Sequence, residues 1–499
     1  MAIPLASKRF SWEDQRSFAA LSGDVNPMHM DAIAARRTSA GSPAVHGVHL
    51  LIWAIDELAK QLTERPIARI KADWSSFVHV GETAELLIES EKTDRLRARI
   101  CLESQPVATL SLFFSAKIPA APGHPTSNAL LQSPTVPYDF AVSALSEQSG
   151  AVGFATPAGQ ADSRFPFAAS ILGSARIAGF LALSRLVGMV CPGLHSIFTG
   201  LDVKVVDEDA RNCIWYKVTA INEQYRYLTQ DVGGAGLSGT VESLVRNPPS
   251  HQPDVSELAR SVQPHEFEGS TAIVIGGSRG LGEVAAKLLA AGGAHVTISY
   301  CLGRADADRV ASSIRTVGAS CEVIQYDARN SEDQLRGLPR APTHVYYFAT
   351  GPISQSRTKP FDRQRFEEFC TFYVDGFARL CSYLNATVEH PVRVFYPSSV
   401  YVSTEERPAG LAEYAMAKAA GEVLCGEINS SHRHIHILSR RLPRMLTDQT
   451  ASLLSDQPIA PSPEVMLAMI RELHSEATSI QIDPCSSHGR ARPNNIHKS

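Results

Sequence analysis

From Pro264 onward, short apolar strands alternate with helical stretches, and a glycine-rich turn stands between the first strand and the first helix. We expect these elements at Thr271–Ile275, Gly282–Ala291, His295–Tyr300, Ala305–Val317, Glu322–Tyr326 and His344–Phe348, followed by two long helices. Strand–helix alternation at this spacing predicts a parallel, doubly wound sheet. The turn reads Gly276-Gly277-Ser278-Arg279-Gly280-Leu281-Gly282, and a helix N-terminus after such a turn attracts a pyrophosphate.

The first 120 residues follow a different pattern, in which helices precede a run of alternating strands. Phe10–Leu21 has helical apolar spacing, with Ser11 as the expected N-cap and Asp14 in the first turn. A buried helix is expected at Val48–Leu58, and strands follow at Ile67–Val80, Ala84–Ser90, Leu96–Ser104 and Val107–Ile118. One buried helix wrapped by antiparallel strands is the hotdog pattern.

A middle unit at 138–248 lies between two linkers, Pro119–Pro137 and Asn247–Val255. Helical material at Phe165–Val190 again precedes strands, which we expect at Ser196–Val206, Cys213–Ile221, Tyr225–Asp231 and Gly239–Arg246. The repeated layout predicts a second hotdog, and an unrelated α+β insert is the alternative. The predicted fold is therefore a double hotdog followed by a doubly wound parallel sheet, with domains at 1–120, 138–248 and 265–486.

The chemistry of the first unit centres on Asp24 and His29, which flank an Asn-Pro turn. The turn folds the chain back, so an acid and an imidazole can face one space. The stretch Gly-Asp-x-Asn-Pro-x-His resembles the motif of the MaoC-like (R)-specific enoyl-thioester hydratases. The resemblance implies that Asp24 and His29 move water on and off an acyl thioester, with the Gly47 N–H as an oxyanion donor. The alternative is that Asp24 only caps a helix and His29 lies on the surface.

The third unit carries Tyr414-Ala-Met-Ala-Lys418 on a helix, and a strand upstream ends near Ser399. Positions i and i+4 share one helix face, so we expect the Lys418 ammonium to lie beside the Tyr414 phenol and to lower its pKa. With the glycine turn, these residues resemble the short-chain dehydrogenase/reductase family over about residues 268–484. In that family Tyr414 would be the acid–base residue and Ser399 would polarise the substrate carbonyl. An exposed helical Tyr–Lys pair is the alternative.

The resemblance also implies the residues of a Rossmann nucleotide site. Asp327 would meet the adenine amino group, Lys418 the nicotinamide ribose, and Thr447 the nicotinamide amide. No acid ends the second strand at Ile298–Arg304, while Arg279 and Arg304 can approach a 2′-phosphate, so we expect NADP(H). The full set of predicted cofactor residues is Gly276, Ser278, Arg279, Gly280, Leu281, Gly282, Arg304, Asp327 and Thr447.

Two departures from the family pattern stand near this site. Phe348-Ala349-Thr350-Gly351 replaces an Asn-Asn-Ala-Gly-like stretch, and Tyr373 stands where a catalytic helix Asn is usual. Ser399 is also farther from Tyr414 than is customary, so Ser398 or Ser403 could take its role.

Composition narrows the cellular setting. A formal charge of −4 without a Lys/Arg run excludes a nucleic-acid footprint, and nine scattered cysteines without a Cys-x-x-Cys pair indicate a reducing compartment and no metal site. No signal peptide or membrane span is expected, which predicts a cytoplasmic protein. A homodimer is compatible with the sequence, which does not fix the oligomeric state.

The two chemistries point to one substrate. We expect a bifunctional enzyme on a 3-oxoacyl thioester, carried by CoA or an acyl carrier protein, that reduces it with NADPH and then dehydrates it. In one alternative only the hydratase works, and the reductase-like unit binds nucleotide or a partner as a scaffold. In another, a thioesterase hotdog is fused to a sugar-nucleotide reductase.

Overall fold

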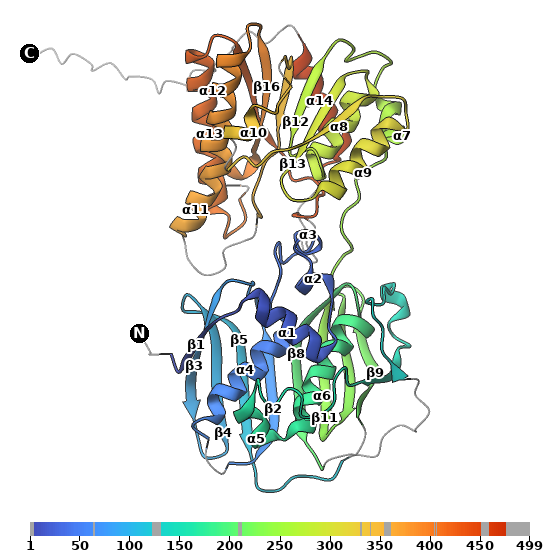
Figure 1. Ribbon diagram of the computed structural model, residues 1–499, viewed down its shortest axis with the longest axis vertical. Helices are drawn as coiled ribbons and strands as arrows, with labels where there is room; N and C mark the ends of the chain where they lie inside the picture. The colour runs from blue at the N-terminus through green and yellow to red at the C-terminus, as the bar shows by residue number, and fades with distance from the viewer. Residues whose placement is uncertain are drawn as a thin grey trace, which may run out of the picture.

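The computed structural model describes residues 4–62, 65–121, 131–207, 212–329, 332–339, 341–353, 361–403, 405, 407–450 and 459–475. The last part of the predicted third domain, 476–486, lies outside these residues. Figure 1 shows a parallel-sheet unit above an antiparallel-sheet unit, with the short helices α2 (Pro27–Met30) and α3 (Ala32–Ala35) between them.

The lower unit is built on one sheet of 11 strands, antiparallel except for the parallel pair β6–β7, in the order β1-β3-β4-β5-β2-β8-β11-β10-β9-β7-β6. The first half contains β1 (Ala6–Arg9), β2 (Ile67–Trp74), β3 (Thr83–Glu91), β4 (Arg95–Leu102) and β5 (Gln105–Phe114). The second half contains β6 (Leu131–Gln132), β7 (Ser149–Gly153), β8 (Ser196–Val205), β9 (Cys213–Asn222), β10 (Tyr227–Gly234) and β11 (Leu237–Val245). Strands β2 and β8 pair antiparallel and so join the halves into one sheet.

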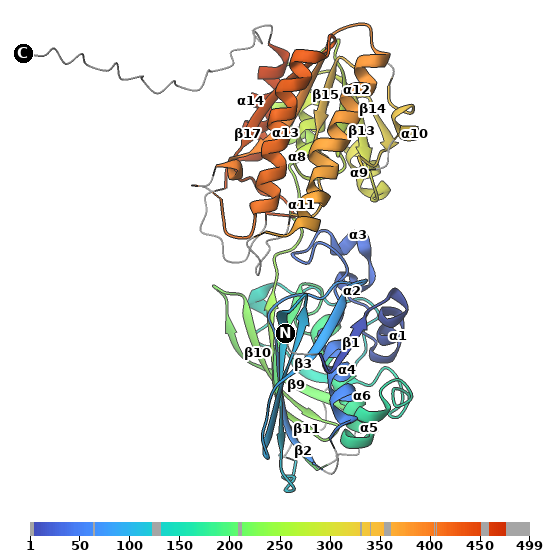
Figure 2. The same ribbon diagram turned by 90° about the vertical axis from the view of Figure 1, so that its left-hand side faces the viewer.

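Helices cover one face of this sheet, as Figure 2 shows. They are α1 (Trp12–Ser22), α4 (Gly47–Ala59), α5 (Pro166–Leu172) and α6 (Ser174–Arg185), which continues into a π-turn at Leu186–Val190. Their apolar side chains and the strands form one hydrophobic core that runs through both halves. Each half therefore places a buried helix against its own strands.

Local sequence signals account for most of these elements. Ser11 caps α1 as predicted, in a capping box with Asp14. Strand β2 ends at Trp74 rather than at Val80, because the chain there turns away to an isolated bridge between His79 and Ala44. The predicted helical stretch in the middle unit is broken at Gly173, whose φ of 85° no other residue adopts readily.

The upper unit has a parallel sheet in the order β14-β13-β12-β15-β16-β17, the doubly wound 3-2-1-4-5-6 arrangement. Its strands are β12 (Thr271–Ile275), β13 (His295–Tyr300), β14 (Cys321–Gln325), β15 (His344–Tyr347), β16 (Val392–Ser399) and β17 (Ile435–Leu442). Helices α8 (Gly280–Ala291), α9 (Arg304–Arg315) and α14 (Ser462–His474) cover one face, with α7 (Val255–Leu258) against α8. The other face of the sheet is covered by helices α10 (Glu332–Leu335), α11 (Arg363–Cys370), α12 (Phe377–Thr387) and α13 (Ala412–Ser431). The predicted parallel sheet is confirmed.

Candidate active sites

Asp24 lies in the short loop between α1 and α2. Gly23 ends α1 in the left-handed region, with a φ of 71°, and turns the chain inward. Asn26, rather than Asp24, caps α2, because its side chain accepts a hydrogen bond from the Met28 N–H. Asp24 is thus free of a capping role, although it is only 2% exposed.

The middle unit supplies the surroundings of Asp24. The Ser184 hydroxyl, on α6, donates a 2.7 Å hydrogen bond to Asp24 Oδ2, and Gly188 of the π-turn presses its backbone against the same carboxylate. A Cβ at Gly188 would lie only 2.3 Å from Asp24 Oδ1. Burial raises the pKa of Asp24, while His29 and the Ser184 hydrogen bond act in the opposite direction. Burial therefore favours the protonated form of the Asp24 carboxyl group.

His29 faces Asp24 from α2. Its Nδ1 lies 2.7 Å from the Ala44 carbonyl oxygen, and because a carbonyl only accepts, Nδ1 carries the proton and Nε2 keeps a lone pair. The His29 ring stacks on His46 at a centroid distance of 4.0 Å. Side-chain nitrogen or oxygen atoms of Asp24, His29 and His46 lie within 4.8 Å of one another. The predicted acid–imidazole pair is brought together.

His46 supports this pair. Its Nδ1 lies 3.3 Å from Gln15 Oε1, and its Nε2 lies 3.1 Å from the backbone oxygen of Asp24. Burial lowers the pKa of His46 well below its usual value, so the ring stays neutral. Three clustered residues of this kind could also hold a metal ion, but the single N–H of the neutral His46 ring is already directed at a protein oxygen, on Gln15 or on the Asp24 backbone.

Gly47 is the first residue of α4, where backbone N–H groups have no partner within the helix. A Cβ there would lie 3.0 Å from the Trp74 ring, so a side chain has little room. The Gly47 N–H is available as a donor at the end of a helix whose dipole favours negative charge.

The upper unit brings Ser399 and Tyr414 together. Tyr414, on α13, is 8% exposed and forms a hydrogen bond with Ser399, at the end of β16. Ser398 instead donates to Glu422, so its hydroxyl is directed elsewhere. Burial raises the pKa of Tyr414 to about 12, and the Ser399 hydrogen bond opposes this shift. The phenol therefore holds its proton at neutral pH and can donate it.

Lys418 does not act as the helical spacing predicts. Its Nζ donates a 2.6 Å hydrogen bond to the Pro397 carbonyl and lies 3.9 Å from the centre of the Tyr373 ring. Burial lowers the pKa of Lys418 to about 7, and the lysine does not contribute to the pKa of Tyr414. The prediction that Lys418 lowers the tyrosine pKa is wrong for this state of the site, because desolvation outweighs a charge held elsewhere.

Tyr373 occupies the place where the family pattern expects Asn. It is fully buried in a π-turn, Thr371–Gly376, between α11 and α12, and its hydroxyl hydrogen-bonds with Thr350. The Lys418 ammonium thus rests on an aromatic face, a cation–π contact, instead of reaching an amide.

The glycine-rich turn has the geometry of a pyrophosphate site. Gly276 has a φ of 78°, and its N–H donates to Ser299 at 3.0 Å. A Cβ at Gly282 would lie 2.3 Å from the Gly276 oxygen, so only glycine permits this close turn. Helix α8 begins at Gly280, and Thr447 lies against that residue. Ser278 is buried and Leu281 is half-buried in the same turn.

Two predicted cofactor residues have other contacts in this structure. The Arg304 side chain is 74% exposed, with its Nε 3.5 Å from Asp308 Oδ2. Asp327 accepts two hydrogen bonds from Arg329, which hold the pKa of Asp327 at about 2. That Arg279 and Arg304 can each approach a 2′-phosphate stays a prediction.

Residues that sequence reasoning missed come from distant segments. Helix α6 of the middle unit delivers Ser184 to Asp24, and the positive charge of Arg185 acts on the same carboxylate. Arg36 and Arg37, after α3, reach across to Asp306 of the upper unit. No local pattern marks such pairings, because they depend on how units pack.

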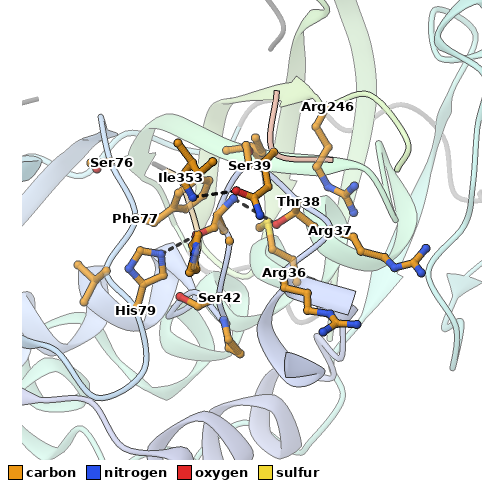
Figure 3. Close-up of a pocket in the computed structure, with 18 of the residues that line it drawn as sticks. Arg36, Arg37, Thr38, Ser39, Ser42, Ser76, Phe77, His79, Arg246 and Ile353 are labelled. Carbon is orange, nitrogen blue, oxygen red and sulfur yellow. Dashed lines mark hydrogen bonds between the residues drawn. The ribbon is translucent and has the colours of Figure 1, made fainter. Parts of the chain in front are cut away.

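One cavity of about 1840 Å³ is lined by residues of both units. Its lining includes Asp24, His29 and Gly47 from the lower unit and Arg279, Thr350 and Tyr401 from the upper unit. Tyr414 is not part of that lining, but Tyr401 influences its pKa. Figure 3 shows part of the cavity wall, where Arg36, Arg37 and Thr38 lie near Ile353.

Comparison with known protein families matches residues 5–110 to a MaoC like domain and residues 270–345 to a short chain dehydrogenase. The chain carries a MaoC-like dehydratase domain followed by a short-chain dehydrogenase domain. The MaoC-like domain identifies the amino-terminal fold as a hotdog. Both domains come from enzyme families.

Individual relatives match each domain separately. The (R)-specific enoyl-CoA hydratase of Aeromonas caviae is 29% identical over 109 residues, covering 21% of this chain and 74% of the relative. An uncharacterized oxidoreductase of Methylorubrum extorquens is 38% identical over 81 residues, covering 16% of this chain and 32% of the relative. The match to the short-chain dehydrogenase domain thus spans about a third of that relative's length.

A solved short-chain dehydrogenase from Burkholderia cenocepacia in complex with NADP is 21% identical. The match covers 43% of this chain and 94% of that chain, with a TM-score of 0.39. Among the described residues, no single helix is apolar and long enough to cross a membrane. Pro166–Leu172 with Ser174–Val190 passes that test only as a pair bent by 110°.

Proposed function

We propose that this chain is a bifunctional acyl-thioester enzyme. Its short-chain dehydrogenase domain reduces a 3-oxoacyl thioester with NADPH, and its MaoC-like domain removes water from the resulting (R)-3-hydroxyacyl thioester. The observation that carries this proposal is the shared cavity, which Asp24 and His29 line together with Thr350 and Tyr401. The product of one reaction is the substrate of the other, so a common cavity lets the intermediate pass between them.

Dehydration requires a base at C2 and an acid at the departing hydroxyl group. His29 Nε2, which has the lone pair, takes the C2 proton, and protonated Asp24 gives its proton to the C3 hydroxyl, which leaves as water. The C2–H electron pair becomes the new double bond. The Gly47 N–H stabilises the negative charge that develops on the thioester oxygen. Hydration runs through the same groups in reverse.

Reduction requires a proton at the C3 oxygen and a hydride at C3. Tyr414 donates that proton, because its raised pKa keeps it protonated, and Ser399 positions the carbonyl through its hydroxyl. Gly276 and Gly282 form a turn that fits the pyrophosphate of a dinucleotide. When bound there, NADPH supplies the hydride. The absence of an acid at the end of β13 favours NADPH over NADH.

We further propose that the middle unit is a second hotdog, with domains at 1–120, 138–248 and 265–486. The helix-on-strands layout of α6 and the β2–β8 junction support this division. The second hotdog lacks the acid–imidazole motif and instead completes the first site through Ser184 and Gly188. The thioester carrier is CoA or an acyl carrier protein in a cytoplasmic setting.

A second candidate function follows from Tyr373. Its ring contacts Lys418 at the position where the family usually has an Asn amide. The upper domain would then bind nucleotide without catalysing a reduction. In that case the chain is a hydratase with a nucleotide-binding scaffold.

The experiment uses the full chain and separates the two activities. Asp24→Asn and His29→Ala should abolish hydration of an enoyl-CoA while NADPH oxidation with a 3-oxoacyl-CoA continues, and Tyr414→Phe should do the reverse. Arg97→Ala, in an ion pair of β4 with Glu89, is the control and should change neither rate. If wild type binds NADPH but never oxidises it, the scaffold function replaces the bifunctional one.

A further inference from the structure

Two arginines of the MaoC-like domain extend into the dehydrogenase domain. Arg36 and Arg37 follow α3, the helix that stands between the units in Figure 1. Arg36 Nη2 donates a 2.6 Å hydrogen bond to Asp306 Oδ2, and Arg37 donates to the other oxygen of that carboxylate. The three side chains are only 15%, 18% and 13% exposed, so this contact is largely shielded from water.

A third arginine completes the cluster. Arg279, from the glycine-rich turn, donates a 3.2 Å hydrogen bond to the Arg36 carbonyl, and its Nη1 lies 3.6 Å from Asp448 Oδ2. Burial lowers the pKa of Arg279 to about 10, and the Arg36 charge adds to that shift. Three arginines therefore face two carboxylates, which leaves excess positive charge. Arg36 Nε is also buried without a hydrogen-bond partner among the described residues.

The cluster stands at the end of the second parallel strand. Gly303 is the N-cap residue of α9, shortly after β13, and a Cβ at Gly303 would lie 2.0 Å from Arg36 Nη2. In a doubly wound sheet, the ribose that carries the adenine lies at this strand end, and an arginine nearby can donate hydrogen bonds to a 2′-phosphate. Arg36 occupies the place where Arg304 was expected.

We propose that Arg36, Arg37 and Arg279 bind the 2′-phosphate of NADP(H), so that the MaoC-like domain supplies part of the cofactor site. This inference rests on the proposed reductase function. Asp306 holds the two arginines when the phosphate is absent and competes with it for their N–H donors. Guanidinium groups bind phosphate through charge-assisted hydrogen bonds, which NADH cannot offer at this position.

The test is a fluorescence titration of the full chain with NADPH and with NADH. Arg36→Ala and Arg37→Ala should each weaken NADPH binding about tenfold or more, since each removes hydrogen bonds to a charged group, and should leave NADH binding unchanged. Gly303→Ala should act in the same direction by displacing Arg36 without removing charge. Arg97→Ala is the matched control, and enoyl-CoA hydration by each variant reports correct folding.

Asp306→Asn separates this role from a simple contact between domains. If the arginines bind phosphate, this variant binds NADPH more tightly, because a competitor is lost. If the cluster only joins the domains, Asp306→Asn and Arg36→Ala change nucleotide binding equally, and the proposal is overturned. Equal NADPH binding by wild type and both arginine variants overturns it as well, while the reductase proposal stands. A wild type that binds neither nucleotide overturns both.

Discussion

The Ser184 hydroxyl donates a 2.7 Å hydrogen bond to Asp24, although the two residues are 160 positions apart and belong to different halves of the lower unit. The predicted catalytic acid therefore receives a hydrogen bond from a helix, α6, whose own sequence carries no hydratase motif. The pairing of β2 with β8 makes the sheet continuous across the two halves.

Ser184→Ala should slow hydration about tenfold or more, because hydrogen bonds to charged groups contribute about 1.5–3 kcal/mol. That hydrogen bond lowers the pKa of Asp24, so its loss raises the pKa further. Hydration needs ionised Asp24, and the acidic limb of its pH–rate profile should move to higher pH. Ser170→Ala, an exposed serine on α5, is the control. An unchanged profile would show that Ser184 does not act through Asp24.

Gly188→Ala should remove hydration almost completely, because the new Cβ would overlap Asp24 Oδ1 and displace the carboxylate. NADPH oxidation by the same protein should persist. Gly426→Ala, where a Cβ meets no atom within 4 Å, should stabilise α13 by up to about 1 kcal/mol and leave both rates alone. Rates and thermal midpoints of both variants check this. A folded, fully active Gly188→Ala variant would contradict the close contact between Gly188 and the Asp24 carboxylate.

Tyr373→Leu should change the pH dependence of reduction. Removing the ring takes away a cation–π contact that favours charged Lys418, so the pKa of Lys418 should fall further below its usual value. If protonated Lys418 assists proton transfer, the alkaline limb of the NADPH oxidation profile moves to lower pH. Tyr225→Leu, half-exposed in the middle unit, serves as the comparison. A limb that stays in place would exclude Lys418 as its source.

His49 makes stability depend on pH. Its ring is fully buried between Phe10 and Phe18, and burial lowers the pKa of His49 to about 3. Below the unfolded value of about 6.5, the unfolded chain binds more protons, so stability falls by up to about 1.4 kcal/mol per pH unit as pH drops toward 3. Urea unfolding between pH 7.5 and 4.5 should show this slope, and His49→Phe should flatten it. Equal slopes would assign the effect to other groups.

The sequence alone predicted what local patterns control. Ser11 with Asp14 marked the start of α1, and the glycine turn and strand–helix alternation marked the doubly wound sheet. The Asn-Pro turn placed Asp24 and His29 together because both lie within one short loop and helix.

The features that the sequence did not predict depend on packing between distant segments. The spacing of Tyr414 and Lys418 correctly placed them on α13, but a long lysine side chain goes where partners exist, here Pro397 and the Tyr373 ring. The Arg36–Asp306 contact crosses 270 positions, and nothing near Arg36 in the sequence indicates it.

Mass spectrometry of the products from a 3-oxoacyl-CoA and NADPH tests the central claim most directly. We expect wild type to yield the enoyl thioester and Asp24→Asn to stop at the 3-hydroxyacyl thioester. Tyr414→Phe should leave the 3-oxoacyl substrate intact. If Asp24→Asn still forms the enoyl product at the wild-type rate, the acid–imidazole site does not dehydrate this substrate, and the account is wrong.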